Sequence, residues 1–120
     1  MKQNVIQEKS FEFSVRIINL YKYLITEKKE FVLSKQILRS GTSIGANIEE
    51  GLGGFTDCDF VYKLQLSYKE TRETIYWLKL LHRTDFITKE QFDSMIADAN
   101  EIQKILSSII LTKSEKLKMK

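Results

Sequence analysis

The sequence predicts an all-α fold, an antiparallel up-down-up-down four-helix bundle. The chain contains no proline, and its five glycines all fall between residues 41 and 54, so little elsewhere interrupts a helix. Apolar side chains recur at steps of three and four along four segments of about 20 residues each. Short turns separate these segments, and helices so connected pack side by side in alternating directions.

The first two helices are predicted over residues 10–28 and 32–51. The apolar face of the first consists of Phe13, Ile17, Leu20, Tyr21 and Leu24. The second continues a helical spacing through Leu33, Ile37, Ile44 and Ile48, but serine, glycine and alanine make it narrow between residues 40 and 46. A glycine inside a helix costs about 1 kcal/mol relative to alanine, so we expect a close helix–helix contact there to compensate.

The third and fourth helices are predicted over residues 57–83 and 88–112. A glycine turn precedes the third, with Asp57 or Asp59 as its N-cap. Thr88 and Gln91 have the spacing of a capping box at the start of the fourth. The core faces are Phe60, Leu64, Ser67, Thr71, Ile75 and Leu78 on the third helix, and Phe92, Ile96, Ala99, Ile102, Leu106 and Ile109 on the fourth. The residues that follow are predicted to form a frayed basic tail.

Length and composition indicate one domain over residues 1–120. The chain has 42% apolar residues and a formal charge of +3, a basic excess that permits nucleic-acid binding without arguing for it. Cys58 is the only cysteine, which excludes an internal disulfide and favours a reducing compartment, the cytoplasm. We expect no secretory segment and no membrane span, because no stretch approaches 18 uncharged residues.

The side chains that metal or covalent chemistry requires are scarce. His82 is the only histidine, and Lys79 three residues earlier excludes the Glu-x-x-His motif of di-metal bundles. Cys58 and His82 cannot supply the ligands of a zinc site, and no motif orients a base towards a nucleophile. The sequence therefore predicts no catalytic residue, no metal, no cofactor and a non-enzymatic protein.

Polar residues follow one line on each of the two middle helices. Ser40, Ser43, Asn47 and Glu50 recur at steps of three, four and three, and Glu70 and Glu73 share a line with Leu66 and Trp77. Buried carboxylates need partners, so we expect them to meet groups such as Arg39, Arg16, Asn47 or a serine hydroxyl. The predicted polar core network is Arg39, Ser40, Ser43, Asn47, Glu50, Glu70 and Glu73. We favour a role in fixing helix pairing over a ligand or partner site.

Three tyrosines lie partly off the main stripe of the third helix. Tyr62, Tyr68 and Tyr76 are candidates for a subunit interface, where tyrosine is enriched. Base stacking is the alternative, but no basic groove is evident around these rings.

Two blocks of sequence resemble a known family. The run Arg-Ser-Gly-Thr-Ser-Ile-Gly-Ala-Asn-Ile-Glu-Glu-Gly over residues 39–51, and Lys-Glu-Thr-Arg-Glu-Thr over residues 69–74 followed by Trp77 and Leu78, are similar to the bacterial 23S rRNA intervening-sequence protein family. The resemblance extends from about Phe11 to Ile109. It implies a four-helix bundle and a homopentameric ring. In a related branch, the accessory variability determinant of diversity-generating retroelements, a more basic pentamer works with a reverse transcriptase and binds nucleic acid.

Two hypotheses of function follow. The first is a non-enzymatic oligomeric module that binds RNA or a ribonucleoprotein. Its candidate nucleic-acid contacts are Lys28, Lys29, Lys35, Lys113, Lys116 and Lys118. The alternative is a protein-protein interaction scaffold without a nucleic-acid role, whose apolar and tyrosine-rich surfaces bind a partner enzyme.

Overall fold

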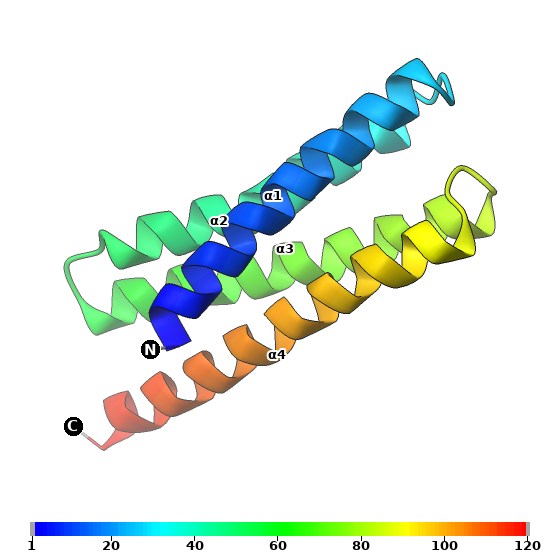
Figure 1. Cartoon of the computed structure of the whole chain (residues 1–120). Helices are drawn as coiled ribbons and strands as arrows, with labels where there is room; N and C mark the ends of the chain where they lie inside the picture. The colour runs from blue at the N-terminus through cyan, green and yellow to red at the C-terminus, as the bar shows by residue number, and fades with distance from the viewer. Residues whose placement is uncertain (1, 120) are drawn as a thin grey trace.

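Four helices build the molecule and confirm the predicted all-α bundle (Figure 1). The computed structural model describes the backbone of residues 2–119 and the side chains of residues 5–119, so residues 1 and 120 of the predicted domain lie outside the described part. The helices are α1 (Lys2–Thr26), α2 (Leu33–Leu52), α3 (Asp57–Arg83) and α4 (Lys89–Lys118). Within the described range no strand occurs.

Successive helices run in opposite directions, so the connections alternate between the two ends of a body measuring 52 × 22 × 21 Å. Each helix contacts two neighbours: α1 packs on α2 and α4, and α3 packs on α2 and α4. The pairs α1 and α3, and α2 and α4, therefore occupy diagonal corners. Fully buried side chains from all four helices, such as Ile17, Ile44, Leu64 and Leu106, fill the centre. Burial of this apolar stripe from each helix is the main stabilising term.

Helix α1 begins about eight residues before the predicted start. Ile6 and Ser10 continue the buried line of Phe13 and Ile17 at steps of four, three and four. The Ser10 hydroxyl is buried and donates to the carbonyl of Gln7 at 3.1 Å. A serine at a core position interrupts the apolar pattern, which is why the sequence did not predict the first two turns.

Helix α4 also continues beyond its predicted end. The segment predicted to be a frayed tail is helical to Lys118, and Leu117 within it is half-buried. The ammonium of Lys113 lies 5.7 Å from the centroid of the Phe60 ring, which attaches this part of α4 to the start of α3.

The narrow middle of α2 packs closely against α1. A Cβ atom at Gly41 would lie 2.6–2.8 Å from three side-chain carbons of Ile17, closer than any real contact. At Gly45 the nearest atoms, Ser10 O and Ser14 Oγ, would be 3.4 Å away, an ordinary contact. Gly41 is thus required by packing, and the predicted close approach involves α1.

A buried glutamate caps the start of α2. Glu30 accepts backbone N–H bonds from Ser34 at 2.7 Å, Leu33 at 3.0 Å and Val32 at 3.3 Å. Burial acts to raise the pKa of Glu30, but these three donors outweigh it, and the pKa lies below its ordinary value of 4.5. The carboxylate satisfies N–H groups that the helix itself cannot pair.

The other two helix starts have threonine caps. Thr56 Oγ1 accepts the N–H of Asp59 at 3.0 Å, so the N-cap of α3 is Thr56 and the predicted N-cap, Asp57 or Asp59, is wrong. At α4 the predicted capping box is present: Thr88 Oγ1 accepts from Gln91 N at 3.1 Å, and Gln91 Oε1 accepts from Thr88 N at 2.8 Å.

Candidate functional site

The interior of the α2–α3 contact contains hydroxyl groups that are all paired. Ser40 Oγ and Thr74 Oγ1 are hydrogen-bonded at 2.9 Å, and Ser67 Oγ donates to the carbonyl of Ile44 at 2.8 Å. Ser40, Ser67 and Thr74 have no solvent exposure. Because these bonds join specific positions of two helices, sliding α3 along α2 would leave buried polar groups unpaired.

An ion-pair cluster covers the outer side of the same contact. The guanidinium of Arg39 donates to Glu70 at 3.3 Å and also to Glu73, while Trp77 Nε1 donates to Glu73 Oε2 at 3.0 Å. The side chains of Glu70 and Glu73 are partly buried. Arg39 thus bridges two carboxylates of α3 from α2.

The structure corrects the predicted network in depth and in extent. The Arg39 and Glu50 side chains are 50% and 58% exposed, so they are not core residues. Ser43 Oγ and Asn47 Nδ2 donate to carbonyls of their own helix, at 2.6 Å to Arg39 and 3.0 Å to Ser43. At 3.6 residues per turn, the ten residues from Ser40 to Glu50 do not complete a whole number of turns, so Ser40 is turned inward whereas Glu50 is turned outward.

Glu50 of the predicted network and Arg16, one of its expected partners, form ion pairs outside this cluster. Glu50 forms an ion pair with Lys63 at 2.7 Å, and this hydrogen bond raises the pKa of Lys63. Arg16 joins α4 instead of α3: it pairs with Asp98 at 2.6 Å and donates to Ser94 Oγ at 2.8 Å. Arg16 therefore stabilises the α1–α4 contact.

The candidate nucleic-acid contacts form two groups at opposite ends of the bundle. Lys28 and Lys29 lie in the α1–α2 connection and Lys35 in the first turn of α2. Lys113, Lys116 and Lys118 lie at the end of α4, at the opposite end of the molecule (Figure 1). A single copy of the chain does not bring the two groups together.

The three candidate interface tyrosines also separate. Tyr62 and Tyr76 are more than half exposed on the outside of α3, and Tyr76 contacts Trp77 edge-on. Tyr68 is half-buried and lines a groove of about 550 Å³ between α3 and α4. Tyr68 differs because its position on α3 faces α4.

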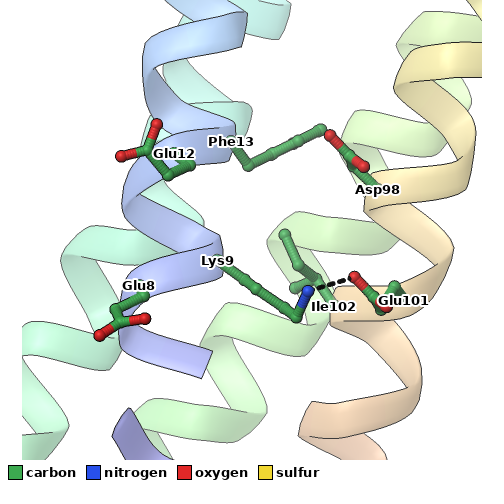
Figure 2. A pocket seen from close by; sticks show the side chains of 7 residues that line it. All are labelled: Glu8, Lys9, Glu12, Phe13, Asp98, Glu101 and Ile102. Atoms are coloured by element: carbon green, nitrogen blue, oxygen red, sulfur yellow. Dashed lines mark ion pairs between the residues drawn. The ribbon is translucent and has the colours of Figure 1, made fainter. Parts of the chain in front are cut away.

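A second depression, of about 280 Å³, lies between α1 and α4 (Figure 2). Lys9 reaches across it to Glu101 at 2.7 Å, and this hydrogen bond raises the pKa of Lys9. Figure 2 shows the Glu8 and Glu12 carboxylates turned away from α4, so the acidic side chains do not converge. Over the described residues, no group of three or more histidine, cysteine or acidic side chains could hold a metal ion.

The two residues considered for chemistry, Cys58 and His82, are too far apart to act as a nucleophile and its base. His82 stacks on Phe92, with ring centroids 4.7 Å apart and planes inclined by 16°. Cys58 is an exposed thiol in the first turn of α3, whereas His82 lies in the last turn of this 27-residue helix. At 1.5 Å per residue, the rise along the helix from Cys58 to His82 is roughly 36 Å.

Among the described residues, no helix combines the length and the hydropathy that a membrane span requires.

The fold defines the class of this protein, an all-α four-helix bundle. Comparison with known families gives its particular family: the chain belongs to the 23S rRNA-intervening sequence protein family, whose model matches residues 2–108. A solved structure similar to it is a protein of unknown function from the S23 ribosomal protein family of Bacteroides thetaiotaomicron. The two are 59% identical, with a TM-score of 0.91 over 92% of this chain and 98% of that one. Comparison with curated proteins gave no match.

Proposed function

We propose that this protein is a non-enzymatic, cytoplasmic, oligomeric module that binds RNA or a ribonucleoprotein. The observation that carries the proposal is the state of the candidate lysines. Lys28, Lys29, Lys35, Lys116 and Lys118 are exposed, and none of them belongs to the ion pairs of the described residues. By contrast, Lys9, Lys63 and Lys89 are neutralised by carboxylates. Unpaired surface lysines are available to phosphate groups.

Assembly would strengthen this weak charge. One copy carries three candidate lysines at each end, too few for tight binding to a polyanion. A cyclic homo-oligomer, a pentamer in the family that the sequence resembles, would repeat each group around the symmetry axis. Five copies would carry about five times the +3 charge of one chain.

Salt-dependent binding tests the proposal. Binding of a structured RNA is measured by filter retention between about 50 and 200 mM salt, a range over which binding to phosphate groups weakens strongly. The variants K28A/K29A/K35A and K116A/K118A should weaken binding and flatten the slope of log K against log salt by about one for each lysine–phosphate interaction removed. The control K63A/K89A removes two lysines already paired with carboxylates and should leave the slope almost unchanged. Absence of binding at low salt refutes the proposal.

The second candidate function is a protein-protein scaffold without a nucleic-acid role. Tyr62 and Tyr76 support it, because large exposed aromatic side chains are typical of protein interfaces. Purification from the native host separates the two candidates: co-purifying RNA favours the first, and a stoichiometric protein partner favours the second. In that experiment Y62A/Y76A should release the protein partner and leave RNA in place.

A further inference from the structure

Two of the apolar surfaces that the described residues form have no partner among these residues. The first is a ridge on α1 formed by Phe11, Val15 and Ile18, which follow one another at steps of four and three and so lie on one line. All three are exposed, Phe11 by 65%. The neighbouring residues Phe13 and Ile17 are buried in the core, so this α1 ridge points away from it.

The second surface is the groove between α3 and α4. Tyr68 and Lys69 line it from α3, and Ser107, Ile110 and Leu111 line it from α4. Leu111 is 62% exposed. We call this surface the α3–α4 groove.

The ridge and the groove lie on opposite sides of the molecule. Helix α1 contacts α2 and α4, and α3 occupies the diagonal corner. A chain therefore cannot place its own ridge in its own groove. A second copy can do so.

Acidic side chains lie beside the first two residues of the ridge, and basic side chains lie beside the middle of the groove. Glu8 and Glu12 stand three residues before Phe11 and Val15, and their exposed carboxylates point away from α4 in Figure 2. Beside the groove, Lys69 is followed at a step of three by Arg72, and Lys104 precedes Ser107 by three. These five charged side chains are outside all ion pairs found among the described residues.

We propose that the α1 ridge of one copy docks into the α3–α4 groove of the next copy, with Glu8 and Glu12 facing Lys69, Arg72 and Lys104. The inference rests on the oligomeric part of the proposed function and identifies the surfaces that form it. Because the two patches differ, the contact is head-to-tail, and repeating it gives a ring where the rotation between neighbouring copies divides a full turn evenly. An apolar centre with a charged rim is the usual anatomy of such an interface.

Charge reversal with restoration tests the pairing. Light scattering should give a multiple of 14.1 kDa for the wild-type chain and about 14.1 kDa for E8K/E12K and for K69E/K104E. The quadruple variant E8K/E12K/K69E/K104E re-creates attraction with the signs exchanged and should recover the wild-type mass. Circular dichroism checks that each variant keeps its helices, as exposed substitutions should. An assembly that withstands both double variants would overturn the contact.

Cysteine cross-linking tests its head-to-tail character. In a C58S background, oxidised F11C/L111C should give a ladder of covalent dimers and larger species on a non-reducing gel, whereas F11C alone and L111C alone should remain monomers. Dimers from a single-cysteine variant would indicate a symmetric contact and overturn the proposal.

Retention of RNA by the wild-type chain is measured in parallel. If the wild-type chain binds RNA and all the charge-reversal variants keep the mass of the wild-type assembly, the ridge–groove contact alone is refuted. A monomer that does not bind RNA refutes the proposed function as well.

Discussion

Ser40 Oγ and Thr74 Oγ1 are hydrogen-bonded at 2.9 Å inside the α2–α3 contact, where neither side chain is reached by solvent. Thr74 Oγ1 also lies 2.8 Å from the carbonyl of Glu70 in its own helix. Together with the bond from Ser67 to the carbonyl of Ile44, this pair fixes the position of α3 along α2.

A double-mutant cycle should measure this coupling. Thr74→Val keeps the shape of the side chain but leaves the Ser40 hydroxyl without its partner, and should cost roughly 1–3 kcal/mol of unfolding free energy. Ser40→Ala removes the group that would be left unpaired. The double variant should therefore be more stable than the sum of the singles by about 0.5–1.5 kcal/mol in urea unfolding at fixed protein concentration. Strict additivity would contradict a coupled pair.

Two glycines of α2 should respond in opposite directions to alanine. Gly41→Ala places a Cβ against the buried Ile17, and overpacking of about 1–3 kcal/mol should outweigh the gain of about 1 kcal/mol in helix propensity. Gly45→Ala meets only ordinary contacts, so it should be neutral or stabilise by up to about 1 kcal/mol. Thermal unfolding of the matched pair decides this. Equal effects at both positions would show that α1 and α2 do not approach as described.

The Glu30 cap should make stability depend on pH. Its folded-state pKa lies below the ordinary value of 4.5, so the ionised carboxylate stabilises the folded chain above that pH. Its contribution is lost as pH falls through the folded-state pKa. Glu30→Gln should cost about 1 kcal/mol near pH 7, the usual value of a cap, and the difference from wild type should vanish in acid. A difference that is constant with pH would mean that the charge is not what stabilises α2.

Glu73 tests whether the outer cluster is structural. Glu73→Ala removes the carboxylate shared by Arg39 and Trp77 and should lower stability by about 1 kcal/mol, or the melting temperature by about 4 °C. Asn47→Ala should have a smaller effect, because its amide bonds only within α2. Unchanged melting temperatures combined with loss of RNA or partner binding would assign this cluster to recognition instead.

The sequence predicts the helices where apolar spacing is regular. It does not predict helix ends and caps that depend on other interactions. Ser10 occupies a core position and conceals the first turns of α1, and the residues after 112 form helix although Leu117 is their only half-buried apolar side chain. Glu30 caps α2 because its side chain folds back over the N–H groups of the residues that follow it, and no sequence motif indicates this cap.

The candidate site shows the same division. Spacing places Ser40 and Glu50 on one line, but their depths depend on the exact direction of each side chain. The separation of Lys28 from Lys118 could have been predicted, because an up-down-up-down chain puts its first connection and its last residues at opposite ends. The α3–α4 groove could not, since it depends on how two helices diverge.

Trp77 gives the α2–α3 contact an optical signal. It is the chain's only tryptophan, it is half-buried, and its indole N–H bonds to the carboxylate that Arg39 also holds. Intrinsic fluorescence excited at the indole therefore reports on one known place in the molecule. Opening of that contact, by denaturant or by a bound partner, changes the emission without any attached dye.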